Sequence, residues 1–407
     1  MDILFVHQNF PGQFRHVGPA LVQKGHRVVA LATNSGPGNF SGVQVVNYGA
    51  AIKQRLGALG AGRKPDDWQS KIIRGQAVAD ALLELKAKGF VPQVVFAHSG
   101  WGEALFVRSV LPDVRFLIYA EYYYGLPGGD VGFDPEFARP SVADAQRVIL
   151  KNTHLLHALG SCDAALTPTE FQKSRHPAWA QRNMEVIHEG IDTAKFHPDP
   201  SAWVQLQSAG LTLRAGDEVI TFVARHLEPY RGYHIFMRAL PLIQKLRPNA
   251  RVVIVGGDGV SYGAPAPGGE SWKNVFLGEV QDKIDLSRVH FVGKVPHHLL
   301  TRLMQISAAH VYLTYPFVLS WSLLEAMSIG CLIVASDTAP VREVIEHGKT
   351  GLLTDFFDVQ ALAERVAEAL ERRAELADVR TRAREHVIAN YDLASICLPR
   401  QLAFIEG

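Results

Sequence analysis

Short runs of apolar residues alternate with longer amphipathic stretches along the whole chain. In the first half, the runs that read as buried strands are 3–7, 27–32, 43–48, 93–98, 115–120, 164–168 and 184–188. The second half repeats this plan at 219–224, 251–257, 289–293, 311–315, 331–336 and 351–354. Amphipathic segments such as 14–24 and 66–88 lie between several of them. Strands that are apolar throughout and separated by helices predict mostly parallel sheets covered on both faces.

Two such sheets fit a chain of 407 residues better than one. The predicted fold class is therefore α/β, with two doubly wound domains. Two prolines in AKFHPDPSAW mark a boundary between residues 192 and 216. We expect the first domain to span 1–200 and the second 201–389, with a terminal helix at 390–407 packing back on the first. Ligands of such sheets bind at the carboxyl ends of the strands, so the cleft between the domains is the expected site.

Composition excludes several classes of protein. Hydrophobic residues make up 47% and charged residues 20%, as in a soluble globular protein, and the formal net charge of +1 gives no field for nucleic acid. The three cysteines, Cys162, Cys331 and Cys397, have no metal or redox spacing. The N-terminus lacks a basic region like that of a signal peptide, and no apolar stretch reaches the ~18 residues of a membrane span. These features predict a cytoplasmic protein.

Three segments of the first half hold candidate chemistry. Gly12, in VHQNFPGQF at the first strand-to-helix turn, lets backbone amides approach an anion, although a simple tight turn explains it equally well. His98 ends a strand in FAHSGWGE, where a structural role is the more common alternative, and Trp101 follows it. In YAEYYYG, Glu121 and Tyr123 suit an acceptor sugar, or ordinary core packing.

The second half offers a sharper candidate. VIVGGDGVSYG looks like a dinucleotide fingerprint, but it does not fit G-x-G-x-x-G and falls on the second turn of its domain, which argues against nicotinamide binding. In FVARHLEPYRG, Arg225 closes a strand and Arg231 opens the next helix. Two guanidiniums there suit a diphosphate, because their forked N–H groups match phosphate oxygens. The alternative is a surface salt bridge with Glu228.

One carboxylate, Glu325, stands in the apolar stretch YPFVLSWSLLEAM. A carboxylate near a helix start is stabilised by the macrodipole by roughly 0.3–1 kcal/mol, which explains Glu325 without a ligand. That explanation leaves the apolar residues before it unexplained, because their backbone amides also require partners if buried. A ligand with anionic oxygens and hydroxyls would satisfy both.

Taken together, three passages resemble the GT-B fold glycosyltransferases of family 4, retaining enzymes that use nucleotide sugars and have two Rossmann-like domains facing across a cleft. VIHEGIDTAKFHP resembles the family's V-I-P-N-G-V-D-x-x-x-F-x-P, and FVARHLEPYRG its V-x-R-L-x-x-x-K-G. SWSLLEAMSIGCLIVASDTAPVREVIEHGKTGLL is similar to its donor-site block. The resemblance spans nearly the whole chain and is strongest at 217–358.

The resemblance implies a role for each matching residue. Gly12 lies in the loop over the donor diphosphate, and His98 lies near the donor sugar. Arg225 and Arg231 neutralise the leaving diphosphate, which makes a metal ion unnecessary. Glu325 accepts hydrogen bonds from the ribose hydroxyls.

Backbone groups supply the rest of the implied donor site. The amides around Val318, Leu319 and Ser320 face the sugar and phosphate, and the strand end with Val292 and Gly293 lines the base.

The chain departs from the family pattern at one telling position. The family's E-x7-E motif has an acid eight residues before Glu325, and Phe317 stands there. Since that acid normally touches hydroxyls of the donor sugar, the identity of the sugar is open. In addition, Arg231 replaces the usual Lys and Ser320 the usual Gly.

We therefore expect a retaining glycosyltransferase that moves a sugar from a nucleotide-diphosphate sugar, with UDP or GDP, to an acceptor hydroxyl of a glycan, lipid-linked sugar or small molecule. Bacterial polysaccharide, glycolipid or other glycoconjugate synthesis would use it, without a further cofactor. The alternatives are a catalytically weak nucleotide-sugar-binding subunit and another GT-B enzyme such as a nucleotide-sugar epimerase. A basic strip at 53–74 suggests contact with the inner face of the membrane, or a solvated surface.

Overall fold

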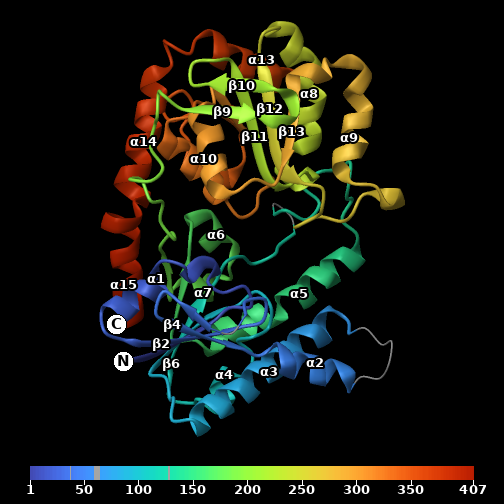
Figure 1. Cartoon of the computed structure of the whole chain (residues 1–407). Coiled ribbons are helices and arrows are strands. Elements are labelled where there is room, and N and C mark those ends of the chain that lie inside the picture. The colour runs from blue at the N-terminus through green and yellow to red at the C-terminus, as the bar shows by residue number, and fades with distance from the viewer. Residues whose placement is uncertain (37, 59–64, 127–128) are drawn as a thin grey trace. The chain divides into compact units, whose positions relative to one another are not determined.

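The computed structural model describes residues 1–36, 38–58, 65–126 and 129–407, which form two compact units. Unit 1 comprises Met1–Gly190 and Ala394–Gly407, and unit 2 comprises Ile191–Leu393 (Figure 1). The chain thus leaves unit 1 once, completes unit 2, and returns to unit 1 for its last helix.

Unit 1 is built on an eight-stranded sheet in the order β3-β4-β2-β1-β5-β6-β7-β8. All its pairs are parallel except β3 with β4. The strands are β1 (Asp2–Val6), β2 (Arg27–Ala32), β3 (Gly38–Phe40), β4 (Val43–Asn47), β5 (Val94–His98), β6 (Arg115–Tyr119), β7 (Ala164–Thr167) and β8 (Met184–Val186). The helices are α1 (Val17–Gln23), α2 (Gly49–Gly57), α3 (Asp67–Ala87), α4 (Val107–Val110), α5 (Val142–Ser161), α6 (Glu170–Arg175), α7 (Ala178–Gln181) and α15 (Leu398–Glu406).

Both faces of this sheet are buried, as the continuous apolar runs predict. Along β1, Leu4 and Val6 pack into one hydrophobic core, whereas Ile3 and Phe5 pack into another. Helix α3 begins where the sequence indicates, because the side chain of Asp66 accepts a hydrogen bond from the Gln69 amide (2.7 Å) in a capping box.

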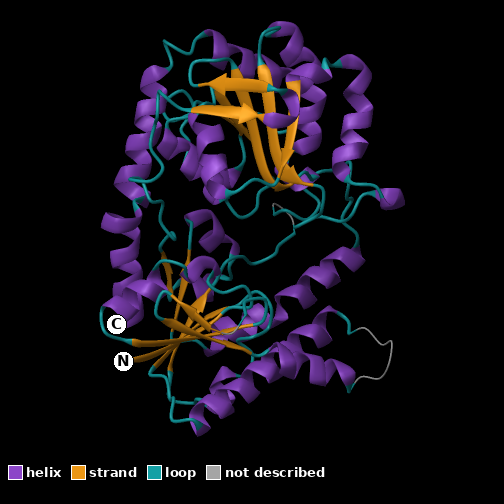
Figure 2. Ribbon diagram, in the orientation of Figure 1, coloured by secondary structure: helices purple, strands orange, loops and turns teal. Residues whose placement is uncertain are grey.

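Unit 2 has a six-stranded parallel sheet in the order β13-β12-β11-β14-β15-β16, and its strands are flanked by helices (Figure 2). A two-stranded antiparallel ribbon, which the sequence pattern does not indicate, precedes it. The strands are β9 (Trp203–Leu206), β10 (Leu211–Arg214), β11 (Val219–His226), β12 (Arg251–Gly257), β13 (Val289–Gly293), β14 (Ala309–Tyr312), β15 (Ile333–Ser336) and β16 (Leu352–Thr354). The helices are α8 (Tyr233–Leu246), α9 (Trp272–Val280), α10 (His297–Gln305), α11 (Trp321–Ile329), α12 (Ala339–Arg342), α13 (Val359–Glu371) and α14 (Ala377–Tyr391).

Each sheet has a point where the strand order reverses. In unit 1, β1 lies between β2 and β5, and in unit 2, β11 lies between β12 and β14. At such a point the connections leave toward opposite faces of the sheet and open a crevice at the carboxyl ends of the strands. The loops after β1 and β5, and after β11 and β14, are therefore where a ligand of each unit is expected.

The basic strip predicted at 53–74 lies partly outside the described residues, which omit 59–64. Among its described cations, Arg55 and Lys71 form ion pairs with Asp80 and Asp67. Among the helices of the described residues, none has the length and apolar character that a membrane span requires.

Candidate functional site

Arg231 is the central cation at the reversal point of unit 2. It ends a short 3-10 turn after β11 and is buried, with only 7% of its surface exposed. Its Nη1 donates to the Thr314 hydroxyl (2.8 Å), the Val318 carbonyl (3.2 Å) and the Tyr312 hydroxyl (3.3 Å). Although burial alone would lower the pKa of Arg231, the nearby Tyr312 and Tyr262 hold it above its usual value. The charge of buried Glu228 also acts on Arg231, but no carboxylate among the described residues forms an ion pair with this guanidinium, so the position suits an anionic ligand.

Arg225 differs from Arg231 in its surroundings. It lies within β11 and is exposed, and among the described residues it has no hydrogen bond or ion pair. The structure therefore separates the two predicted arginines into one that is fixed and one that is free to reach a ligand.

Glu228 has a structural role instead of the predicted surface salt bridge. It is fully buried, and its carboxylate accepts hydrogen bonds from the backbone amides of Ser261 (3.0 Å), Gly263 (3.1 Å) and Tyr262 (3.2 Å). The salt-bridge interpretation is wrong because the backbone of the loop after β12 satisfies this carboxylate. Glu228 thereby fixes that loop, including Tyr262, whose ring lies 5.2 Å from the Arg231 guanidinium carbon.

Phe317, at the position of the expected acid, is part of an aromatic cluster. It is buried (6% exposed), and its ring centroid lies 5.1 Å from that of Tyr262 and 5.7 Å from that of Tyr230. Tyr230 also packs against Tyr315 at 4.7 Å. Tyrosine rings therefore pack against the segment that follows β14.

The segment Val318–Ser320 approaches helix α11 through hydrogen bonds to its neighbours. The Val318 carbonyl accepts from Arg231, and the Ser320 amide donates to the Tyr312 hydroxyl (2.9 Å). Ser320 is the N-cap of α11 and accepts from the Ser322 amide, while Leu319 is buried in the hydrophobic core.

Glu325 is not at a helix start. Helix α11 begins at Trp321 and has no acidic residue in its first turn, so the macrodipole explanation of Glu325 is wrong. Its carboxylate is nearly buried, and Oε1 lies 3.3 Å from Nε2 of His297 at the start of α10. The partner of this carboxylate therefore comes from the preceding strand-helix unit, β13–α10, which the sequence spacing does not indicate.

The glycines of VIVGGDG make room for a histidine and a lysine. A Cβ atom on Gly257 would lie 2.5 Å from Cε of Lys294 and 3.0 Å from the His226 ring. The Lys294 ammonium donates to Nε2 of His226 (2.9 Å), so Nδ1 of that neutral ring donates to the Ser261 hydroxyl (2.6 Å). Lys294 follows Gly293, which has a φ of 64° and, with half-buried Val292, ends β13.

In unit 1, His98 lies at the reversal point between β1 and β5. The ring is buried, stacks on Trp101 with centroids 4.2 Å apart, and packs against Tyr119 on its other side at 5.3 Å. Its Nδ1 accepts from the Gly100 amide (3.0 Å), so Nε2 is a ring nitrogen that carries a hydrogen. Nε2 lies 3.5 Å from a Glu121 carboxylate oxygen and has no hydrogen bond among the described groups.

A relay that the sequence analysis missed connects His7 to Glu121. Nδ1 of His7 accepts from the Asn9 amide (3.0 Å), and Nε2 donates to Oε1 of Gln13 (2.7 Å). The Gln13 amide nitrogen in turn donates to Glu121 (2.8 Å). Burial alone would raise the pKa of Glu121, but the neighbouring His98 ring, whose Nε2 lies 3.5 Å away, lowers it below its usual value, so this carboxyl stays ionised. Burial and the charge of His98 lower the pKa of His7 to about 3.

Gly12 is required at its position by geometry. Its φ is 44°, and a Cβ atom there would lie 2.5 Å from the His7 ring.

The three acceptor-side candidates do not all lie together. Trp101 and Glu121 both contact His98, whereas Tyr123 packs against His176 with centroids 5.8 Å apart.

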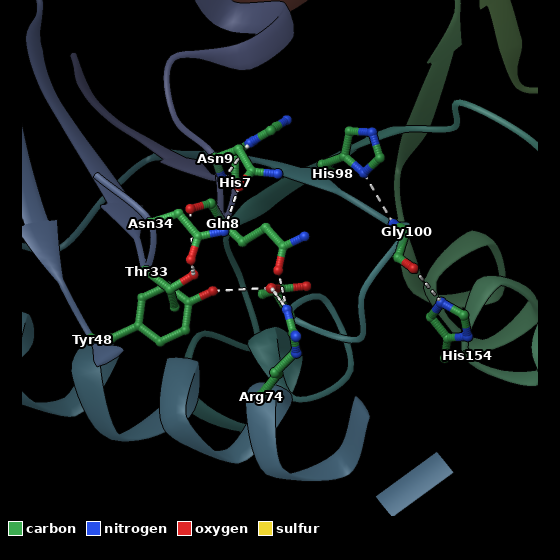
Figure 3. A network of polar contacts seen from close by, with 11 residues as sticks. His7, Gln8, Asn9, Thr33, Asn34, Tyr48, Arg74, His98, Gly100 and His154 are labelled. Atoms are coloured by element: carbon green, nitrogen blue, oxygen red, sulfur yellow. Dashed lines mark hydrogen bonds and ion pairs between the residues drawn. The ribbon is translucent and has the colours of Figure 1, made fainter. Parts of the chain in front are cut away.

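A second polar cluster occupies the same edge of the sheet (Figure 3). Glu103 is fully buried; Oε1 accepts from the Tyr48 hydroxyl (3.0 Å) and lies 3.8 Å from Arg74, while Oε2 has no hydrogen bond among the described groups. Burial raises the pKa of Glu103 above its usual value. Arg74 also donates to Gln8 in the loop after β1, so this cluster fixes the loop that precedes Gly12.

Comparisons with known proteins agree on one family. Residues 24–196 match a family model described as "Glycosyl transferase family 4 group", and residues 205–386 match "Glycosyl transferases group 1". The GDP-mannose-dependent alpha-(1-6)-phosphatidylinositol monomannoside mannosyltransferase of Mycobacterium tuberculosis is 27% identical over 231 residues, 56% of either chain. The D-inositol 3-phosphate glycosyltransferase of Corynebacterium urealyticum is 28% identical over 246 residues, 58% of this chain and 52% of that protein. The chain thus matches about half the length of these curated relatives.

Solved structures match over the full length. Sucrose-phosphate synthase from Thermosynechococcus elongatus has a TM-score of 0.75 at 16% identity, covering 100% of this chain and 98% of that one. Anabaena HepE, in complex with UDP and glucose, has a TM-score of 0.66 at 17% identity, covering 99% and 98%. These similarities confirm the predicted GT-B fold of two Rossmann-like domains.

Proposed function

Because this chain belongs to the glycosyltransferase family that the two matching models describe, we propose that it transfers a sugar from a nucleotide-diphosphate sugar to an acceptor hydroxyl. The observation that carries the proposal is the buried Arg231 guanidinium, held at the carboxyl end of β11 by Tyr312, Thr314 and a backbone carbonyl. A departing diphosphate would supply an anion in direct contact with the guanidinium, and a cation placed in advance stabilises that leaving group. Exposed Arg225 is proposed to close on the same phosphates.

The other parts of the donor site follow from the family resemblance. Glu325 is proposed to accept from the ribose hydroxyls, with His297 as its orienting partner. The amides of Val318–Ser320 would face the sugar and phosphate, the end of β13 the base, and Gly12 the diphosphate. UDP and GDP are both proposed donors; the Mycobacterium tuberculosis relative is named for GDP-mannose, and HepE was solved with UDP.

We propose that His98 and Glu121 serve the reacting sugar and the acceptor. The Nε2–H of His98 has no hydrogen bond among the described groups and can donate to a hydroxyl of the donor sugar. Glu121 is ionised and already receives the Gln13 amide, so it orients a hydroxyl better than it removes a proton. The proton would then pass to the departing phosphate on the same face, which gives retention without a metal ion.

The proposal is tested by nucleotide binding. The full chain is titrated with UDP, GDP, ADP and TDP in a thermal-shift assay, since a ligand of the folded state raises its stability. Arg231→Gln should weaken binding of the preferred nucleotide by at least about a hundredfold, because two charge-assisted hydrogen bonds are worth about 3 kcal/mol or more together. Arg238→Gln is the matched control, since Arg238 pairs with Glu279 on the surface of the same unit. Unchanged binding by Arg231→Gln would contradict the proposal.

Chemistry is tested separately. His98→Phe keeps a ring between Trp101 and Tyr119 but removes the N–H, so kcat should fall about 10²-fold or more while nucleotide affinity stays within twofold. Proton NMR of the first product shows its anomeric configuration, and inversion would reject the retaining mechanism.

Phe317 motivates the second candidate function, a nucleotide-sugar-binding subunit with little turnover. The ring packs on Tyr262 and Tyr230 where the family has an acid that touches the donor sugar. Turnover with any donor, measured as nucleotide release that depends on an acceptor, would reject this candidate. A Phe317→Glu variant that keeps the original donor preference would show that the ring does not select the sugar.

A further inference from the structure

A pocket of about 420 Å³ lies at the edge of unit 2 opposite Arg231. Its walls include Gly216 before β11, Gln305 at the end of α10, and Gly330 after α11, just before β15. Since β11, β14 and β15 are parallel, their starts share one edge of the sheet and their carboxyl ends the other. The pocket is therefore separate from the proposed donor site.

Two guanidiniums line this pocket, and each is anchored by one backbone carbonyl. Nη1 of Arg373 donates to the Gly216 carbonyl (3.1 Å), and Nε of Arg380 donates to the Gly330 carbonyl (2.6 Å). Both side chains are half-buried. Their other N–H groups have no hydrogen bond or ion pair with any described residue, so each arginine is held in place with donors to spare.

The positive charge of the pocket is poorly offset. Burial and the charge of Arg380 lower the pKa of Arg373. Arg380 lies in the first turn of α14, where the helix macrodipole disfavours a cation. The charge of Asp217 offsets part of that of Arg373, although no ion pair joins the two among the described residues. Asp199 in the pocket wall is already engaged, because hydrogen bonds from Ser201 and Arg302 lower its pKa to about 2.

Two like charges in one half-buried pocket are unfavourable unless an anion lies between them. A phosphate suits two guanidiniums best, since each fork can donate two parallel hydrogen bonds to its oxygens. The volume falls in the usual range for small-molecule sites and exceeds what a bare ion requires.

We propose that the pocket between Arg373 and Arg380 binds a phosphate group, either of inorganic phosphate or of a phosphorylated sugar. A ligand there cannot contact the donor-binding edge, so it acts as an effector that stabilises unit 2. Arg380 contributes a structural bond through Nε and ligand contacts through its terminal nitrogens.

The test is calorimetric titration at constant ionic strength, with inorganic phosphate in one arm and glucose 6-phosphate in the other. All proteins carry Arg231→Gln, which removes competing phosphate binding at the donor site. Saturable one-to-one binding is expected, and adding Arg373→Gln should weaken it at least tenfold, equivalent to about 1.4 kcal/mol. Tighter binding of glucose 6-phosphate would identify the ligand of the pocket as a phosphorylated sugar, whereas equal binding of the two would identify it as inorganic phosphate.

Controls separate binding from folding. Arg372→Gln, next to Arg373 but paired with Glu368 and Glu375, should leave the affinity unchanged. Arg380→Lys keeps the charge while losing the forked donor and the Nε bond to the Gly330 carbonyl, so it should weaken binding, and the melting temperature measured without phosphate reports the separate loss of that bond. Absence of saturable binding in both arms, or equal affinity with and without Arg373→Gln, would overturn the proposal.

Discussion

Mild acid should unfold unit 1 before unit 2, because buried neutral histidines are concentrated in unit 1. Burial is the main cause that lowers the pKa of His7 to about 3, and of His154, His176 and His188 to about 4. In unit 2, burial lowers the pKa of His310 to about 4. Burial also lowers the pKa values of three more exposed histidines, His226, His290 and His386.

The sign of the effect follows from proton uptake. Each of these histidines is neutral when folded and gains a proton on unfolding once the pH falls below its unfolded pKa of about 6.5. The stabilisation is therefore complete above pH 6.5 and is lost as the pH falls toward the folded pKa. Between pH 7 and 5 the loss is about 2 kcal/mol per histidine, and this figure changes little for any folded pKa below about 4.

The four histidines together would cost unit 1 about 7 kcal/mol, comparable to the whole stability of a typical domain. Urea unfolding followed by hydrogen exchange and mass spectrometry at pH 7, 6 and 5 assigns the loss to peptides of each unit. Carboxylates with lowered pKa values add to the loss mainly below pH 5.

A pair of variants on helix α5 makes the measurement specific. His154, whose Nε2 donates to the Gly100 carbonyl (3.1 Å), is buried, and His157 is exposed. His154→Gln should reduce the loss between pH 7 and 5 by about 2 kcal/mol, even if it lowers the stability at pH 7. His157→Gln should leave the loss unchanged. The reasoning would be refuted if both units lost the same unfolding free energy between pH 7 and 5 and if His154→Gln did not reduce that loss.

Three further predictions concern the loops of the two sheets. Gly12→Ala should cost 1–3 kcal/mol or so by chemical denaturation and lower kcat, because its Cβ would meet the His7 ring at 2.5 Å; an unchanged midpoint would contradict this. Gly257→Ala should displace Lys294, and a crystal structure with that lysine unmoved would show that the backbone yields instead. Glu228→Ala leaves three loop amides without their acceptor, so a destabilisation of about 3 kcal/mol and faster exchange at those amides are expected, whereas native protection would contradict it.

The sequence predicts the sheets well because their signal is local. The apolar runs at 3–7 and 219–224 correspond to β1 and β11, and both faces of each sheet need apolar residues regardless of what the loops contain. The ribbon β9–β10 was missed, since short alternating strands such as Trp203–Leu206 give a weaker pattern than buried runs.

Site chemistry is predicted less well because it depends on contacts distant in sequence. His7 belongs to the segment VHQNFPGQF, but its hydrogen-bonded link to Glu121 runs through Gln13, and Gln13 and Glu121 are 108 residues apart in the sequence. Glu228 was expected to pair with an arginine, but its carboxylate accepts hydrogen bonds from the backbone of a loop. Glu325 was expected at a helix start, but its carboxylate pairs with His297. A histidine at the end of the first strand was the available signal for His7.

The path of the chain has a consequence for how the protein is made. Unit 2 is continuous and its two ends meet, with the Ile191 amide donating to the Tyr391 carbonyl (2.8 Å) and the Leu393 amide to that of Ile191 (2.9 Å). Unit 1 receives α15 only after unit 2 has been translated, and Gln401 there donates to the His188 carbonyl (2.8 Å). During synthesis, unit 2 can therefore complete its core before helix α15 of unit 1 has been translated.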